Sequence, residues 1–134
     1  MFELDSRLHN DTFFVCDLTL CRVLLMNDKQ FPWLILVPMR DNIAEIIDLS
    51  EHEQQLLLKE SATVSKVMLQ LFAPYKLNVG ALGNVVRQLH VHHVARFETD
   101  VAWPKPVWGN QPPIAYADAQ ASEILAALKQ ALSE

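Results

Sequence analysis

The sequence predicts an α+β domain in which an antiparallel β-sheet of about five strands packs against one long helix and a C-terminal helix. Three observations predict this class. Short apolar runs bounded by turn residues lie on both sides of a single long helix, that helix begins with a capping box, and the chain closes with a second stretch of helical periodicity. The 134 residues, 51% of them hydrophobic, fit one domain spanning residues 1–134.

The predicted strands are short segments rich in apolar and β-branched residues, and they are bounded by polar or glycine-containing turns. They are residues 13–16, 23–26, 33–37, 76–81 and 85–94. The expected turns are residues 17–22, 27–30 and 82–84. The segment 33–37 is apolar throughout, which is typical of a central strand covered on both faces or lying under a subunit interface.

A capping box marks the start of the long helix. In the segment 50–53, the Ser50 hydroxyl and the Glu53 carboxylate are spaced to bond backbone N–H groups at a helix N-terminus. Apolar residues then recur at helical spacing to about Phe72, and the proline two residues later ends the helix. The same spacing over residues 118–132 predicts the C-terminal helix.

Two segments are expected to be less regular. Asp41 or Asn42 is predicted to cap a short helix over residues 43–47. Residues 100–114 contain four of the seven prolines and two of the three tryptophans. Because tryptophans are largely buried in folded proteins, we expect this segment to be an irregular arm packed on the domain.

Composition excludes several classes of partner and compartment. The formal net charge of −5 gives no bulk basic surface for a nucleic-acid backbone. The first residues lack the basic and apolar regions of a signal peptide, and the longest apolar run is too short to cross a bilayer. Cys16 and Cys21 do not form a disulfide framework. We therefore expect a cytoplasmic protein that binds neither nucleic acid nor membrane.

Three of the five histidines are close together near the end of the last predicted strand. Side chains alternate between the two faces of a strand, so Gln88, His90 and His92 are expected on one face and His93 on the other. Such a polar stripe indicates a solvated sheet face, a metal site or a catalytic site. The loop at residues 78–84 leads into the strand, and its glycines allow backbone N–H groups to approach an anion. This context favours catalysis at a phosphate.

The segment 78–96 resembles the signature of the histidine triad (HIT) family, in which an Asn-x-Gly loop precedes three histidines separated by single apolar residues. Two anchors set the register. Counting forward from Asn84, which stands at the family's glutamine position, places the first triad position at Gln88. Counting back from the arginine that closes the segment places the third position at His92. His90 therefore takes the middle position, which is the nucleophile in this family.

The resemblance extends over roughly residues 12–109. Asn27 ends a strand whose terminal Asn or Asp holds the ribose hydroxyls in the family. The segment 36–40 is similar to the end of the next strand in the family. The arm with Trp103 and Trp108 is similar to the tryptophan- and proline-containing tail of the Hint branch.

The resemblance implies a hydrolase or nucleotidyl transferase acting at the α-phosphate of a nucleoside phosphoramidate or dinucleoside polyphosphate. His90 would hold its Nδ1–H against a backbone carbonyl and attack phosphorus through Nε2, forming a nucleotidyl-histidine intermediate. The implied catalytic residues are His90, His92 and Gln88, and the implied phosphate and ribose ligands are Asn27, Asn78, Gly83 and Asn84. No metal or cofactor is implied. The resemblance also implies a homodimer that joins two sheets edge to edge.

The sequence departs from the family pattern at several positions. Gln88 replaces the first histidine, and a carboxamide cannot be protonated near neutral pH. The loop before it is one residue shorter than usual, and Asn84 stands in place of glutamine. Val85 occupies the position of a common Ser or Thr, and Trp33 that of a fourth histidine. These departures leave open a second interpretation, a nucleotide-binding module with little turnover.

A metal-binding protein is a further alternative. His90, His92 and Glu98 form an H-x-H-x5-E pattern that superficially resembles the ligand sets of double-stranded β-helix dioxygenases. Those folds are almost entirely β, whereas residues 50–72 predict a long helix. The sequence specifies neither the natural substrate and leaving group nor the base preference, and it does not show whether the arm reaches a partner's active site.

Overall fold

One open antiparallel sheet organises the molecule, in the strand order β1-β2-β3-β5-β4. The computed structural model describes all 134 residues. The strands are β1 (Thr12–Asp17), β2 (Cys21–Met26), β3 (Trp33–Pro38), β4 (Lys76–Gly80) and β5 (Val91–Arg96). The helices are α1 (Ser6–Asp11), α2 (Glu51–Phe72) and α3 (Asp118–Ser133), with a single 3-10 turn, η1, at Ile46–Asp48. The predicted α+β class with five strands, a long helix and a C-terminal helix is confirmed.

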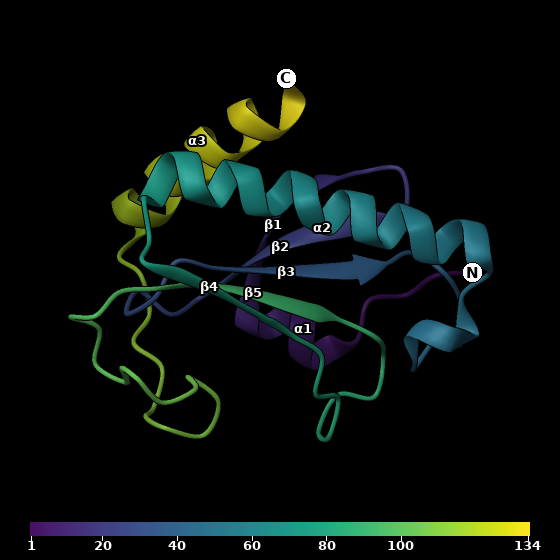
Figure 1. Cartoon of the computed structure of the whole chain (residues 1–134), viewed down its shortest axis with the longest axis horizontal. Coiled ribbons are helices and arrows are strands. Elements are labelled where there is room, and N and C mark those ends of the chain that lie inside the picture. Colours follow the sequence, from purple (N-terminus) through teal and green to yellow (C-terminus); the bar gives the residue numbers. More distant parts are fainter.

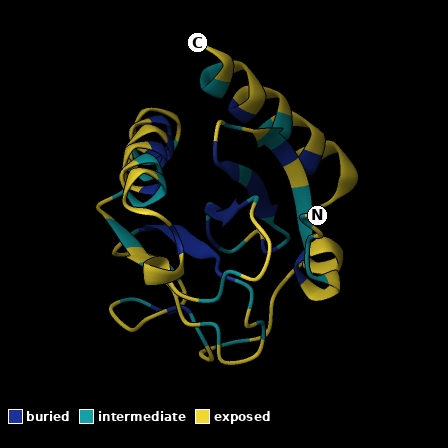
Figure 2. Cartoon of the chain, turned by 90° about the vertical axis from the view of Figure 1, so that its right-hand side faces the viewer, coloured by how far each residue is buried: buried dark blue, intermediate teal, exposed yellow.

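The two faces of the sheet are covered by different parts of the chain. Helices α2 and α3 lie on one face, and α1 lies on the other (Figure 1). Along β3, Leu34 and Leu36 pack toward α2, whereas Trp33 and Ile35 pack with α1 and residues 102–107 of the arm. All six residues of β3 are buried, which confirms the predicted central strand covered on both faces. Buried residues accordingly concentrate in the sheet, while the helices expose their outer sides (Figure 2).

Helix α2 begins and ends as its sequence predicts. The Ser50 hydroxyl accepts a hydrogen bond from the Glu53 backbone N–H, and the Glu53 carboxylate accepts one from the Ser50 N–H. Ala73 then adopts a left-handed conformation with φ +47°, and Pro74 prevents continuation. In the middle of the helix, the buried Glu60 carboxylate accepts hydrogen bonds from the backbone of the β1–β2 turn at 2.8 and 2.9 Å. Helix and sheet are therefore joined by polar contacts as well as by the apolar core.

Three local predictions were wrong. The helix expected over residues 43–47 is only the η1 turn, whose N-cap is Glu45 rather than Asp41 or Asn42. The strand expected over residues 85–94 begins at Val91, so residues 85–90 form an irregular loop. The six-residue helix α1 near the N-terminus was not predicted. The loop before β5 is held by a distant backbone partner, since the Leu89 N–H donates to the Ile43 carbonyl.

The irregular arm predicted over residues 100–114 spans residues 97–117, and Arg96 ties its beginning to the sheet. The guanidinium bonds the Asp100 carboxylate at 2.8 and 3.1 Å and the Asn78 Oδ1 at 2.7 Å. Arg96 is 1% exposed, and its guanidinium lies over the rings of Phe31 and Trp103. Strand β5, strand β4 and the arm are thus held by one buried cation.

The far end of the arm is tied down at the turn after β2. The Asn27 Oδ1 accepts a hydrogen bond from the Tyr116 N–H at 2.9 Å, and the buried Asp28 carboxylate accepts one from Ile114 N–H at 3.3 Å. The arm therefore crosses the face of the sheet opposite α2 and is fixed at both ends. None of the helices combines the length and apolarity needed to cross a membrane.

Candidate active site

His90 and His92 lie side by side where the last loop enters β5. Their ring centroids are 4.8 Å apart, and each residue is 6% exposed. The Nε2 atom of each ring has no hydrogen-bond partner in the protein. Two buried imidazoles with unpaired Nε2 atoms can therefore face one reacting group.

The His90 ring is oriented by the main chain. Its Nδ1 lies 2.7 Å from the Gln88 carbonyl oxygen. A carbonyl only accepts hydrogen bonds, so Nδ1 carries a proton, and in the neutral ring Nε2 keeps its lone pair. A neutral imidazole in this tautomer is a nucleophile at Nε2.

The His92 ring is enclosed by aromatic side chains. The Trp33 indole Nε1 lies 3.0 Å from its Nδ1, and the rings of Trp33 and Trp108 meet it edge-on at centroid distances of 5.6 and 5.5 Å. Burial, together with neighbouring His90 and His93, lowers the pKa of His92 to about 3. His92 is therefore neutral throughout the physiological pH range.

His93 belongs to the opposite face, as its position in the strand predicts. It is fully buried, with Nδ1 3.1 Å from the Val91 carbonyl oxygen and Nε2 2.7 Å from the Ser61 hydroxyl of α2. Because the carbonyl fixes the proton on Nδ1, Nε2 accepts from the serine. Both polar atoms of His93 are satisfied, and it contributes to the packing of α2 on the sheet.

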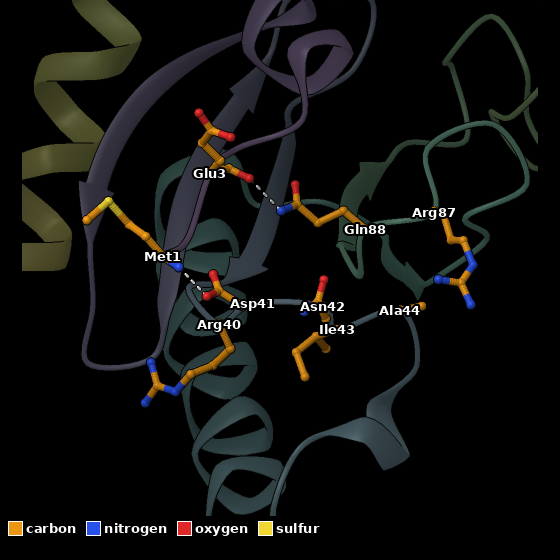
Figure 3. Close-up of a pocket in the computed structure, with 9 residues that line it drawn as sticks. All are labelled: Met1, Glu3, Arg40, Asp41, Asn42, Ile43, Ala44, Arg87 and Gln88. Carbon is orange, nitrogen blue, oxygen red and sulfur yellow. Dashed lines mark hydrogen bonds and ion pairs between the residues drawn. The ribbon is translucent and has the colours of Figure 1, made fainter.

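Gln88 does not share the stripe of the two histidines, which corrects the face predicted for it. Because β5 begins only at Val91, Gln88 lies in the preceding loop. Its carboxamide donates to the Glu3 carbonyl at 2.8 Å and accepts from the Asp5 N–H at 2.9 Å. Its side chain thus points to the N-terminal segment (Figure 3). Only its main-chain carbonyl contacts His90.

A polar cavity of about 430 Å³ lies beside this contact (Figure 3). It is closed on one side by the N-terminal ammonium of Met1, which pairs with the Asp41 carboxylate. A second cavity, of about 510 Å³, shares Arg87 and Gln88 with it. His90 and Gly83 line this second cavity. The structure therefore brings the candidate nucleophile and the glycine loop to one cavity.

The loop residues occupy different environments. Gly83 has φ +72°, a conformation that an L side chain rarely adopts, so a glycine is required at this turn. Asn84 is exposed at the loop surface. Asn78 lies on β4 opposite Val94, and its Oδ1 is bound by Arg96, so only its amide N–H groups are free to donate.

Asn27 lines a different cavity, of about 490 Å³, between α1, the end of β2 and the arm. Trp33 and Trp108 line the same cavity, and both contact His92. The Asn27 Oδ1 is bound by the arm, which leaves its amide N–H groups free. Two further atoms of this region, Trp108 Nε1 and Gln111 Oε1, are buried without a partner. The cavity thus carries unpaired polar groups beside His92.

Sequence reasoning missed the role of Trp33. It counted this residue only as a departure from the family pattern, and it interpreted Trp108 as packing for the arm. The only signal available was an indole at the start of the apolar strand predicted over residues 33–37. The contact itself joins residues 59 positions apart, which no local pattern reveals.

The metal alternative finds no geometry to support it. No three His, Cys, Asp or Glu side chains lie close enough together to hold a metal ion. Glu98 is exposed beyond the end of β5, whereas His90 and His92 are buried in the site.

The antiparallel sheet, the long helix on one face and the paired histidines on the other define a small α+β protein with a histidine-based site. The HIT domain family model matches residues 7–99. The chain belongs to the histidine triad (HIT) family. A search of curated protein sequences gives no match.

Similar crystal structures support this assignment. A histidine triad protein from Marinobacter aquaeolei VT8 is 49% identical with a TM-score of 0.97, over 99% of this chain and 97% of that one. A histidine triad protein from Bradyrhizobium japonicum is 44% identical with a TM-score of 0.95, over 98% of each chain. One from Sinorhizobium meliloti 1021 is 41% identical with a TM-score of 0.94, over 96% of each.

The low pKa of His92 predicts a specific loss of stability in acid. The unfolded chain binds a proton at His92 below about pH 6.5, whereas the folded protein does so only near pH 3. Lowering the pH through this window therefore favours unfolding, by up to about 1.4 kcal/mol per pH unit from this residue. Urea denaturation between pH 7 and 4.5 measures the slope, which should be shallower in His92→Asn.

The exposed His52 of α2 provides the control, because His52→Asn should leave that slope as it is in the wild type. Equal slopes for wild type and His92→Asn would contradict the assignment of a neutral buried imidazole.

Proposed function

We propose that this protein is a nucleotide hydrolase or nucleotidyl transferase that uses His90 as its nucleophile. The observation that carries the proposal is the hydrogen bond from His90 Nδ1–H to the Gln88 carbonyl at 2.7 Å. It leaves the Nε2 lone pair unpartnered, at a cavity that the glycine loop also lines. The proposed substrates are a nucleoside phosphoramidate or a dinucleoside polyphosphate.

The reaction proceeds in two displacements. His90 Nε2 bonds to the α-phosphorus, and the P–N or P–O bond to the leaving group breaks. The leaving group takes the electron pair and a proton from solvent. Water, or another acceptor in a transfer, then attacks phosphorus and breaks its bond to Nε2, which releases a nucleoside monophosphate or a transferred nucleotide. The Gln88 carbonyl stabilises the positive charge on the modified ring in the intermediate.

The phosphate ligands are proposed from the groups that surround the two histidines. His92 lies directly beside His90, and Gly83 lines the same cavity as His90. Asn78 offers its amide N–H groups, and the exposed Asn84 lies next to the glycine. Donors fixed in advance around a phosphate stabilise the charge that develops in the transition state.

The nucleoside is proposed to occupy the cavity between α1 and the arm. The free amide N–H groups of Asn27 suit a ribose hydroxyl, and Trp33 and Trp108 supply aromatic surface beside His92. The leaving group is then proposed to occupy the separate cavity that Gly83 and His90 line.

A nucleotide-binding module with little turnover is the second candidate. The observation that favours it is the position of Gln88, whose carboxamide is committed to Glu3 and Asp5 and offers no proton to a leaving group. Val85 supplies no hydroxyl nearby. Under this alternative the same pocket binds a nucleotide, but the first displacement is slow.

We propose the cytoplasm as the compartment of this protein. Both cysteines, Cys16 and Cys21, are free thiols. Burial beside the Glu60 carboxylate raises the pKa of Cys21, so this thiol is unreactive. Unpaired thiols are typical of a reducing environment.

Turnover by the wild type separates the two candidates, and replacement of His90 with alanine tests the nucleophile. Incubation of the wild type with an adenosine phosphoramidate or a diadenosine polyphosphate should release adenosine monophosphate, with or without a chelator, because the proposed nucleophile is a side-chain nitrogen and not a metal-bound water. His90→Ala should reduce the rate at least 1000-fold, as expected when a covalent nucleophile is removed. His52→Ala, on the exposed first turn of α2, should retain full activity.

No release by the wild type, with adenosine monophosphate still bound in calorimetry, would support the binding module instead. Release that persists in His90→Ala, or that requires added metal, would contradict the proposed mechanism.

We also propose that the protein is a homodimer joined at strand β4. This strand lies at the edge of the sheet, so its outer backbone groups have no strand partner. Next to it, an open apolar hollow of about 500 Å³ is lined by Val79 and by Leu58 of α2, which are 52% and 74% exposed. A second copy paired along β4 would satisfy the strand edge and cover these side chains.

Charge placed on this surface should produce a monomer. Val79→Glu and Leu58→Glu bury an unpaired carboxylate in the proposed interface, so each should halve the mass measured by light scattering during gel filtration. Val101→Glu changes an equally exposed residue on the arm and should remain a dimer. A wild-type protein that is monomeric at micromolar concentration would contradict the proposal.

A further inference from the structure

Trp33 contacts the imidazole of His92, which the proposed function assigns to binding the phosphate. Its Nε1 lies 3.0 Å from His92 Nδ1, and both side chains are at least nine-tenths buried. An indole N–H can donate a hydrogen bond but has no lone pair with which to accept one. His92 Nδ1 is therefore the acceptor and carries no proton.

This contact determines the other side of the His92 ring. A neutral imidazole carries one proton, so with Nδ1 unprotonated the proton resides on Nε2. Nε2 has no partner in the protein, and the centroids of the His90 and His92 rings are 4.8 Å apart. His92 thus presents a free N–H donor on the ring adjacent to that of His90.

The two rings are held in opposite tautomers by partners of opposite kind. An acceptor, the Gln88 carbonyl, leaves Nε2 of His90 as a lone pair. A donor, the Trp33 indole, leaves Nε2 of His92 as an N–H. One atom suits attack on phosphorus, and the other suits a bond to a phosphate oxygen. The reverse tautomer of His92 would point a lone pair at that oxygen and repel it.

We infer that Trp33 is a positioning residue, which fixes the tautomer and ring orientation of His92 so that its Nε2–H donates to the substrate phosphate. The part of this inference that concerns the phosphate rests on the proposed function. The tautomer of His92 rests only on its contact with Trp33. A histidine at position 33 would be able to donate or accept, whereas tryptophan can only donate. The identity of the residue therefore determines the state of His92.

The experiment combines nuclear magnetic resonance of the ring nitrogens with kinetics. In ¹⁵N-labelled wild type, His92 Nδ1 should have the shift of an unprotonated, hydrogen-bonded nitrogen, and Nε2 that of a protonated one. Trp33→Phe keeps an aromatic ring but removes the donor, and it should displace the Nδ1 signal. Trp33→His restores an N–H donor and should restore the signal in large part.

Trp108→Phe is the matched control, because Trp108 touches the same imidazole without a hydrogen bond to it. The nitrogen signals of His92 should show the same protonation state in this variant as in the wild type. Circular dichroism and the melting temperature verify that each variant folds. A Trp33→Phe variant that fails to fold leaves Trp33→His and the wild-type spectrum to decide the question.

The kinetic expectation follows from the loss of an orienting partner. Trp33→Phe should lower kcat for an adenosine phosphoramidate by about 10- to 100-fold, by analogy with the range found when the partner that orients a metal-bound histidine is changed. KM should change much less, and Trp33→His should recover most of the rate. Unchanged kcat and unchanged His92 signals in folded Trp33→Phe would overturn the inference.

The spectra also distinguish this inference from the proposed function. If the wild type turns over no substrate, addition of adenosine monophosphate should still shift His92 Nε2 in the wild type and not in Trp33→Phe. Absence of any such shift overturns the role toward phosphate. A protonated Nδ1 in the wild type overturns the tautomer assignment, whether or not the protein is an enzyme.

Discussion

The buried guanidinium of Arg96 is the interaction on which the arrangement of the site depends. It lies at the end of β5, bonds Asn78 of β4 and holds the Asp100 carboxylate at the start of the arm. Removing one partner of a buried ion pair typically costs about 3–5 kcal/mol, because the other charge is left without compensation. The pair therefore fixes the first residues of the arm against β4 and β5, and the arm then returns to Asn27 and Asp28, where its far end is bound.

Alternation along β5 places His93 and His92 in different environments on opposite faces of the sheet. His93 packs against α2 and is satisfied by Ser61, whereas His92 faces Trp33 and the arm. A one-residue slip of β5 would exchange the two environments and place an unsatisfied imidazole in the apolar core. The ladders on both sides of β5, to β3 and β4, fix this register. The pairing of the central strands thus determines which imidazole reaches the site.

Local signals were sufficient to predict most of the fold. The capping box at Ser50 and the apolar run of β3 each report their element through neighbouring residues, and both predictions are confirmed. The predicted start of β5 was wrong because the loop before it is held by a hydrogen bond from the Leu89 N–H to the Ile43 carbonyl. Ile43 precedes the long helix in the sequence, whereas Leu89 follows it. A pattern of apolar residues within residues 85–94 gives no information about a hydrogen bond to Ile43.

The site was predictable only in part, for the same reason. The histidine spacing identified His90 and His92, and alternation separated His93 from them. Gln88 was assigned to the histidine stripe, but its carboxamide is held by backbone groups 83 and 85 residues away. Trp33 contacts His92 across 59 residues. Such partners depend on tertiary structure, so the chemistry of the two imidazoles followed from geometry and not from the motif.

A covalent intermediate on His90 is the central claim, and intact-protein mass spectrometry tests it most directly. The protein is mixed with an adenosine phosphoramidate and quenched within one turnover under mild alkaline conditions, which preserve a phosphorus–nitrogen bond. We expect a mass increase equal to one adenylyl group, located by peptide mapping to His90 and absent from His90→Ala. An unmodified protein during demonstrable turnover, or an adduct on another residue, would contradict it.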